Sequence, residues 1–413
     1  CSSDLINGGG LKFDYFSPNE KHRFNVFASA QHINRDSYYG GGQDPNAYGN
    51  TTDLNWMAGS QYVYSFGKCI FMPADLTAGI EFNQDKLEDN MWGYHRTVDQ
   101  KVNIGSAFFQ NEWKNEHWGF LIGGRLDKHN LIDHVIFSPR ANLRYNPTEN
   151  INLRFSYSSG FRAPQAFDED LHVENVGGNV AMVELADNLK EERSQSLSAS
   201  ADIYHRFGAF QVNFLVEGFY TKLSDVFALT DGEVVDGILT RTRYNAPGAR
   251  VMGLTLEGKM AYLTKFQVQA GVTLQQSHYS EPHVWNKEAP AVKKMMRTPN
   301  TYGYFTATYT PIKPLSIALS GTYTGSMLVP HEPVPGFLEK PITVNTKDFF
   351  DIGLKAAYDF KLYKSMNLQV NAGVQNIFNA YQNDFDKGAD RDSGYIYGPS
   401  LPRSFFAGVK ISY

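Results

Sequence analysis

Apolar and polar residues alternate in many segments of this chain, each about ten residues long. Between Phe266 and Gln275 every even position carries an apolar side chain, and the odd positions carry Gln, Thr or Gly. A period of two residues is typical of a β-strand with one apolar and one polar face, and long helical periodicity is nearly absent. The pattern predicts 17 strands, over residues 8–16, 22–33, 53–66, 75–87, 99–113, 118–129, 137–146, 151–160, 192–206, 210–227, 242–263, 265–279, 299–310, 314–325, 347–360, 366–376 and 403–413.

The connections between these segments alternate in length. Long loops are uncommon inside compact soluble domains. Short turns on one rim and long loops on the other are typical of an outer-membrane β-barrel. The short connections cover residues 17–21, 146–150, 310–313 and 361–365, and the long ones cover 34–52, 161–191, 280–298, 325–346 and 377–402.

The chemistry of the two strand faces favours the same class of protein. In a large membrane barrel the apolar face meets lipid and the polar face lines a wet lumen. Aromatic residues stand near predicted strand ends, as at Tyr62, Tyr64, Phe66, Tyr358 and Phe360, where an interfacial girdle would place them. For any single strand, the ordinary β-propensity of aromatic residues is the alternative explanation. We therefore expect an all-β fold, a transmembrane antiparallel up-and-down β-barrel.

The composition and the absence of certain motifs limit the classes of function that we expect. The chain has 43 acidic and 38 basic residues, and a formal net charge of −5 argues against a nucleic-acid partner. It contains no run of about 18 apolar residues, so no transmembrane helix is expected. No H-E-x-x-H motif, nucleophile elbow or P-loop occurs in the sequence, and we expect no enzyme activity.

The odd number of predicted strands points to a longer protein. Bacterial single-chain barrels close with an even number, and here the first and last strands would run in the same direction. We expect at least one strand to be missing before Gly8, which makes the chain a C-terminal part. Cys1 leaves a second interpretation open, the lipid-bearing cysteine of a lipoprotein, against an arbitrary start point. Cys69 lies in a predicted periplasmic turn on the opposite rim, so a disulfide with Cys1 is not expected.

Four stretches resemble the C-terminal barrel region of the TonB-dependent receptors, and their order and spacing match throughout. They are Phe155-Ser-Tyr-Ser-Ser-Gly-Phe-Arg-Ala-Pro164, Asn188-Leu-Lys-Glu-Glu-Arg-Ser194, Asn371-Ala-Gly-Val-Gln-Asn-Ile-Phe-Asn379 and Tyr397-Gly-Pro-Ser-Leu-Pro-Arg403. The resemblance covers essentially the whole chain. A final alternating strand follows the fourth stretch, and its residues Val409, Ile411 and Tyr413 would be the signal that the barrel assembly machinery reads.

The resemblance implies an integral protein of the outer membrane of a Gram-negative bacterium. It implies a 22-stranded barrel with a plug domain inside, of which the plug and about five strands would be absent from residues 1–413. It also implies active uptake of a scarce nutrient, a metal chelate such as a ferric siderophore, haem or cobalamin, with a glycan left open. The implied partners are a TonB-type energising complex that acts through the plug, the assembly machinery, outer-membrane lipid and, as a further option, a surface lipoprotein. No cofactor is required.

Aromatic and histidine side chains in the predicted outer loops are candidates for ligand contact, because aromatic rings give a large contact area at little entropic cost. The alternative for each is a loop that packs on itself. Arg162, in Gly160-Phe-Arg-Ala-Pro164, either contacts an anionic ligand or the plug, or pairs with a lumen carboxylate beside a structural turn. The loop candidates are Tyr38, Tyr39, Trp92, Tyr94, His95, His172, His283, Trp285, His331, Tyr395 and Tyr397.

Four aspartates, Asp384, Asp386, Asp390 and Asp392, offer oxygen atoms at a spacing that suits a structural calcium ion. Their segment lacks the full EF-hand pattern and contains Lys387 and Arg391, so a solvated loop is the alternative.

Two other functions stay open at this point. A passive outer-membrane porin would need no plug, but it would need a charged ring at its constriction. A surface lipoprotein binding module that begins at Cys1 would fold without detergent.

Overall fold

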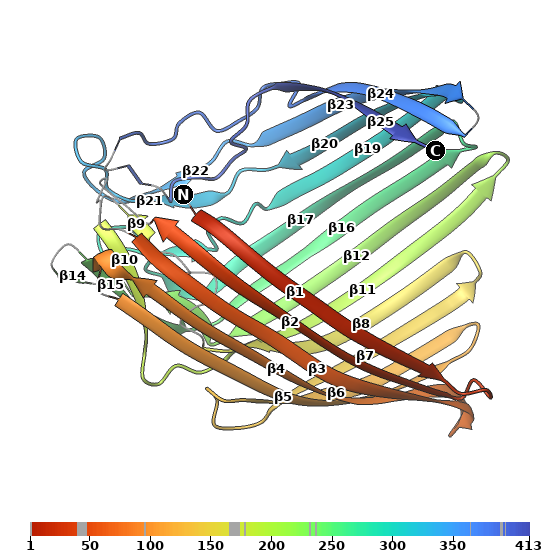
Figure 1. The fold of residues 1–413 in the computed structure, drawn as a ribbon, viewed down its shortest axis with the longest axis horizontal. Coiled ribbons are helices and arrows are strands. Elements are labelled where there is room, and N and C mark those ends of the chain that lie inside the picture. The colour runs from red at the N-terminus through yellow and green to blue at the C-terminus, as the bar shows by residue number, and fades with distance from the viewer. Residues whose placement is uncertain are drawn as a thin grey trace.

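The computed structural model describes residues 2–38, 48–94, 96–164, 174–176, 179–230, 233–235, 238–363, 365–388, 391–392 and 394–413. One large, strongly curved antiparallel sheet forms the body of the molecule (Figure 1). The short strand β18 (Val292–Lys294) pairs with the end of β17. The long strands follow one another in chain order: β1 (Ser2–Phe16), β2 (His22–Tyr38), β3 (Tyr48–Cys69), β4 (Met72–Met91), β5 (Arg96–Lys114), β6 (Trp118–His129), β7 (Ile136–Thr148), β8 (Ile151–Arg162), β11 (Glu192–Phe207), β12 (Phe210–Ser224), β16 (Ala249–Tyr262), β17 (Phe266–His283), β19 (Thr301–Ile312), β20 (Leu315–Thr324), β23 (Phe349–Tyr363), β24 (Met366–Gln375) and β25 (Ser404–Ser412).

Each of the 17 predicted segments corresponds to one of these long strands, so the all-β, antiparallel, up-and-down prediction is confirmed. Short turns join β1 to β2, β3 to β4 and β5 to β6 at one rim (Figure 1). The long connections gather at the opposite rim, which we call the outer rim. Cys69, which carries a free thiol, lies at the short-turn rim as predicted.

Two predicted segments are wrong in their bounds, because residues with positive φ interrupt them. Residues 242–263 were expected to form one strand, but the chain turns at Gly248 (φ 24°) and separates β15 (Ile238–Ala246) from β16. Residues 210–227 divide in the same way at Asp225 (φ 55°), beyond which β13 (Val226–Leu229) begins. Left-handed backbone cannot continue an extended strand.

The long connections contain strands of their own. A five-stranded sheet at the outer rim combines β9 (Glu174–Val176), β10 (Asn179–Leu185), β13, β14 (Glu233–Val235) and β15. Its strands β10 and β15 are parallel, although they come from two different connections. The strands β21 (Leu328–His331) and β22 (Ile342–Asn345) form a further pair, and a 3₁₀ turn, η2 (Trp92–Tyr94), follows β4. The outer connections are therefore built structures that can position side chains.

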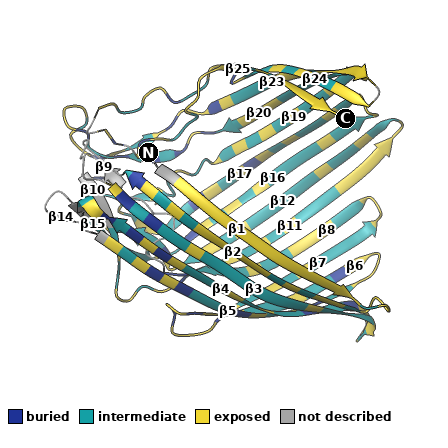
Figure 2. Cartoon of the chain, viewed as in Figure 1, coloured by how far each residue is buried: buried dark blue, intermediate teal, exposed yellow. Residues whose placement is uncertain are grey.

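Apolar side chains are among the most exposed on the long strands, and polar neighbours are often less exposed. Ile80 and Ile122 are 63% and 61% exposed, whereas Asn111 and Thr273 are 7% exposed. Figure 2 shows exposed and less exposed positions alternating along the strands. A soluble protein places its apolar residues the other way round. The arrangement is the one expected where the outer face of a barrel meets lipid.

Within the described ranges, no helix combines the length and the apolar character needed to cross a membrane.

The successive antiparallel pairings lead from β1 to β25, and these two strands point in the same direction, as expected from their odd number. The residues of the expected assembly signal are exposed on this last strand and just after it: Val409 is 72%, Ile411 65% and Tyr413 99% exposed. That the barrel assembly machinery recognises these residues stays a prediction.

Glycines opposite aromatic rings give the sheet several close contacts. Gly373 of β24 pairs with Phe406 of β25, and a Cβ on this glycine would lie 2.4 Å from Cζ of Phe406. The same Cβ would lie 2.5 Å from the backbone oxygen of Leu354. Gly79 and Phe108, on β4 and β5, repeat this arrangement. The rings occupy the space that a larger side chain would need.

Candidate ligand-binding site

A cavity of about 350 Å³ lies among the connections of the outer rim. This volume is within the range of small-molecule sites. Arg162 ends β8, His283 ends β17, and Trp285 follows two residues later, so three of the residues expected to contact ligand line one cavity. The lining also includes Phe227 of β13, Arg241 and Arg243 of β15, and Glu332.

Arginines outnumber acidic residues among the described residues that line the cavity. Three arginines and one glutamate belong to this described lining. The guanidinium carbons of Arg162 and Arg243 lie over the ring of Phe227, 5.4 and 5.8 Å from its centroid. Such cation–π contacts hold guanidinium groups in fixed positions beside an apolar surface. The arrangement combines positive charge with aromatic surface.

Two buried donors at the cavity have no acceptor among the residues that the structure describes. Nη2 of Arg241 donates to Oε1 of Glu332 at 3.3 Å, but Nε of Arg241 has no partner. Nε1 of Trp285 is buried without a partner in the same way. An unsatisfied buried donor costs about 1–3 kcal/mol. A ligand with oxygen acceptors would remove this cost after a shift of the side chains, because both atoms are almost fully covered in this structure.

Glu192 positions the aromatic part of the site. Glu192 lies opposite Arg162 in the register of β11 with β8. Its Oε2 accepts a hydrogen bond of 2.9 Å from the backbone N–H of Phe227. Asn245 also connects these segments, because its side-chain amide donates hydrogen bonds to the backbone oxygens of Lys190 and Asp225. The stretch Asn188–Ser194, singled out in the sequence, therefore holds β13 and its ring under the arginines.

Glu191 connects the same stretch to the connection between β6 and β7. It is 5% exposed, and its Oε1 lies 2.6 Å from Nη2 of Arg193 and 3.0 Å from Nε2 of His134. Burial opposes its ionisation, but the hydrogen bonds from Arg193 and His134 outweigh that effect and hold the pKa of the carboxyl below its ordinary value. A lowered pKa means that the folded state favours the charged carboxylate.

Replacing this carboxylate tests its contribution to stability. We expect Glu191→Gln to lower the free energy of unfolding by about 1–3 kcal/mol at pH 7, because Arg193 loses its charged acceptor. The lowered pKa gives stability that is present above about pH 4.5, the ordinary value, and is lost as the pH falls through the folded value. Urea unfolding in detergent at pH 7 and pH 4 measures both effects, with the exposed Glu149→Gln as the control. Equal stability of Glu191→Gln and the unchanged chain at pH 7 would contradict this role.

Four more of the expected residues gather beside the cavity, next to its lining residues Pro330 and Glu332. The ring of His331 stacks on that of Tyr395, with centroids 3.7 Å apart and planes at 6°. Tyr397 donates to Oδ2 of Asp384 at 2.7 Å. Burial, together with the nearby Asp384, raises the pKa of Tyr395 to about 12. Both tyrosines are therefore neutral donors at physiological pH.

The expected calcium ligands divide into two groups. Asp386 and Asp392 lie with His331, whereas Asp384 accepts from the hydroxyl of Tyr397. Asp390 lies outside the described residues. The calcium prediction stays untested.

The remaining candidates lie elsewhere or are not described. Tyr38, at the end of β2, packs against Tyr48 with ring centroids 5.0 Å apart, and Trp92 is 60% exposed. Neither lines the cavity. Tyr39, His95 and His172 lie outside the described residues, as does the side chain of Tyr94.

Sequence reasoning missed Phe227, Arg241, Arg243 and Glu332. The pair Arg241-Thr-Arg243 did carry a signal, because residues two apart share one face of a strand. The predicted membrane strand 242–263 included Arg243 but not Arg241, whereas both arginines belong to β15 of the outer sheet.

A larger hollow of about 870 Å³ lies on the long strands from β8 to the start of β19. Exposed apolar residues such as Phe155, Leu197 and Leu274 dominate its lining. Its position and chemistry fit the lipid-facing surface, so it is not our candidate for a ligand site.

Comparisons with known proteins agree with this architecture. The family described as TonB dependent receptor-like, beta-barrel matches residues 3–377. No curated protein sequence matches the chain. Among solved structures, the chain is similar to the ferric-catecholate import receptor Fiu from E. coli K12, with 14% identity, a TM-score of 0.70, and coverage of 99% of this chain and 64% of that chain.

Two further structures are similar. A mutant of the ferric enterobactin receptor PfeA from Pseudomonas aeruginosa, in complex with enterobactin, has 16% identity and a TM-score of 0.74, covering 99% of this chain and 62% of that chain. The ferric citrate transporter FecA has 14% identity and a TM-score of 0.71, covering 100% and 62%. At such identities the likeness concerns the fold. The chain spans 62–64% of the length of these three proteins.

Proposed function

The chain belongs to the TonB-dependent receptor β-barrel family, whose members are outer-membrane barrels, and from this membership we propose that it binds an anionic metal chelate for active uptake. Ferric siderophores are the proposed class. We place the binding site in the cavity lined by Arg162, Arg241, Arg243 and Trp285.

The observation that supports this proposal is a pair of buried donors, Nε of Arg241 and Nε1 of Trp285, that have no acceptor among the described residues and belong to side chains lining a cavity with three arginines. A chelate of Fe³⁺ with several deprotonated oxygen ligands presents negative charge and acceptors together. If its ligands are catecholates, it also presents aromatic faces to Phe227 and Trp285. The similar structures agree in kind, since Fiu, PfeA and FecA are named for ferric-catecholate, ferric enterobactin and ferric citrate.

The proposal extends to the whole receptor. Family members depend on a TonB energising complex, and we propose that residues 1–413 form the C-terminal barrel region of a receptor whose plug domain couples to that complex. We also propose a Gram-negative outer membrane as its location. Uptake requires no bond chemistry in this scheme: the ligand binds in the outer connections, and the plug then opens a path.

Charge selectivity tests the proposed ligand class. The purified chain in detergent is titrated with ferric enterobactin, ferric citrate and a neutral ferric trihydroxamate, with quenching of tryptophan fluorescence as the signal. We expect an anionic chelate to bind at least about tenfold more tightly than the neutral one, which corresponds to one charge-assisted hydrogen bond. Added salt should reduce this difference. Equal affinity for all three chelates, or tighter binding of the neutral chelate, would remove the basis of the proposal.

A further inference from the structure

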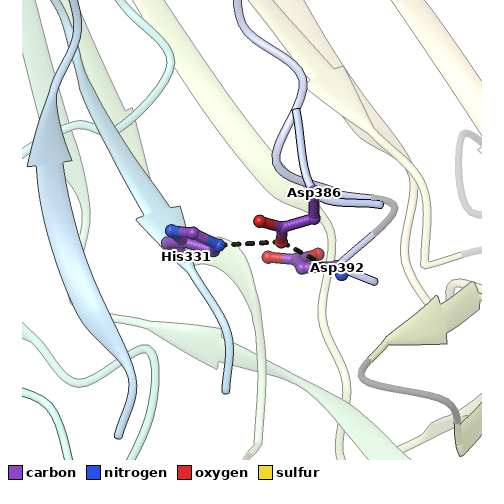
Figure 3. Close-up of side chains that lie close together, drawn as sticks. All are labelled: His331, Asp386 and Asp392. Atoms are coloured by element: carbon purple, nitrogen blue, oxygen red, sulfur yellow. Dashed lines mark hydrogen bonds and ion pairs between the residues drawn. The ribbon is translucent and has the colours of Figure 1, made fainter. Parts of the chain in front are cut away.

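Three side chains with metal-ligating atoms converge beside the cavity, where β21 meets the last outer connection. His331 is the last residue of β21, and Asp386 and Asp392 come from the connection between β24 and β25 (Figure 3). One ligand atom from each lies within 4.8 Å of the others. Nε2 of His331 is 2.8 Å from Oδ2 of Asp386. The side chains of His331 and Asp386 are 7% and 4% exposed, and Asp392 is 5% exposed.

The cluster buries more negative than positive charge. Two carboxylates face one imidazole, which carries at most one positive charge. Arg241 pairs with Glu332, and Arg297 donates to the backbone oxygens of Gly394 and Ile396. Neither arginine forms an ion pair with the two aspartates in the described part of the chain. Buried charge is costly unless it is paired or coordinates a metal, so a divalent cation would balance this cluster.

The backbone holds the ligand atoms in place. Oδ2 of Asp392 accepts from the N–H of Glu332 at 2.9 Å, and its Oδ1 accepts from the N–H of Gly394 at 2.8 Å. Oδ2 of Asp386 accepts from the N–H of Asp392 at 3.2 Å. A carboxylate oxygen has two lone pairs, so each oxygen of Asp392 keeps one for a metal, whereas Oδ2 of Asp386 would exchange its contact with Nε2 of His331 for one with the metal. Metal sites depend on such outer contacts, and the ring of Tyr395 stacked on His331 adds another.

We propose that His331, Asp386 and Asp392 form a site for a resident divalent transition metal of the zinc type. Calcium prefers oxygen ligands only, whereas imidazole suits zinc and similar metals, so the nitrogen of His331 decides between them. The metal pins the connection between β24 and β25 to the end of β21. This site is separate from the cavity proposed for the transported chelate, and either assignment can fail without the other.

Zinc binding by the full chain tests this site. The purified protein in detergent is freed of metal with EDTA, transferred to metal-free buffer and titrated with ZnCl₂ alone by calorimetry. We expect one zinc ion per chain, not displaced by a hundredfold excess of CaCl₂. His331→Ala and Asp386→Asn should each weaken zinc binding at least about tenfold, because each removes a ligand. Asp384→Asn, next to the cluster but outside it, is the control and should bind like the unchanged chain.

The rate of cleavage by trypsin gives a second test of the metal site, independent of the measured zinc affinity. Lys387 and Arg391 are exposed between the two aspartate ligands. We expect zinc to slow tryptic cleavage there at least about fivefold in the unchanged chain and in Asp384→Asn, but not in Asp386→Asn. If Asp386→Asn does not fold, Asp392→Asn replaces it. The absence of stoichiometric zinc binding, unchanged affinity in the ligand variants, or cleavage insensitive to zinc would overturn the proposal.

Discussion

Arg241→Gln is expected to weaken binding of an anionic ferric chelate about 10- to 100-fold. The variant removes one charge from the cavity lining and the Nε donor that has no acceptor in the described part of the chain. A hydrogen bond to a charged group contributes about 1.5–3 kcal/mol, and 1.4 kcal/mol corresponds to a factor of ten in affinity. Dissociation constants from fluorescence titration of the two purified proteins in detergent measure the loss.

Two further variants make this result specific. Arg206→Gln removes an exposed arginine of β11 near the short-turn rim, so it should leave the dissociation constant within about twofold. Trp285→Phe keeps an aromatic ring but removes the second unpartnered donor, and we expect a smaller loss of about tenfold, measured by calorimetry. If Arg241→Gln and Arg206→Gln bind the chelate equally well, the cavity is not the binding site.

Gly373→Val is expected to prevent the last strands from packing in their present register. The new Cβ would lie 2.4 Å from Cζ of Phe406 and 2.5 Å from the backbone oxygen of Leu354. A side chain can move away, but a backbone oxygen inside a paired strand cannot do so without breaking the sheet. Overpacking costs typically about 1–3 kcal/mol and occasionally more, and we expect this variant at the upper end or beyond.

Gly258→Val is the matched control for this effect, because a Cβ at Gly258 meets no atom within 4 Å. Refolding into detergent is followed by the shift in electrophoretic mobility between unheated and heated samples. We expect most of the control to refold and little of Gly373→Val to do so. Comparable refolded fractions of the two valine variants would show that the close contact at Gly373 does not constrain the fold.

The strands could be predicted from the sequence because each carries its own periodic signal. Alternation in residues 265–279 depends only on which face each side chain occupies, and β17 (Phe266–His283) contains this segment apart from its first residue. The same logic failed where a turn lies inside an apparently continuous strand. The segment 242–263 contains Pro247-Gly248, a dipeptide typical of turns, and the positive φ of Gly248 separates β15 from β16. A search for period-two alternation alone passes over such a turn.

The site could be predicted only in part, because it depends on how separate connections fold against each other. Arg162, His283 and Trp285 were identified since each follows a predicted strand, at the rim where long loops begin. Phe227 was missed because it was assigned to a membrane strand, and Glu332 because no pattern singles out one carboxylate in a long loop. The pairing of His331 with Asp386 joins residues 55 positions apart, and local sequence carries no signal for it.

The position of the bound chelate in a crystal structure tests directly whether the cavity at the outer rim is the binding site. The experiment is a crystal structure of the chain with the most tightly bound chelate of the titration series, located by the anomalous signal of iron. We predict an iron peak at the cavity, with chelate oxygens within hydrogen-bond distance of Nε of Arg241 and Nε1 of Trp285. An iron peak elsewhere on the molecule, with both donors still lacking an acceptor from the chelate, would contradict the account.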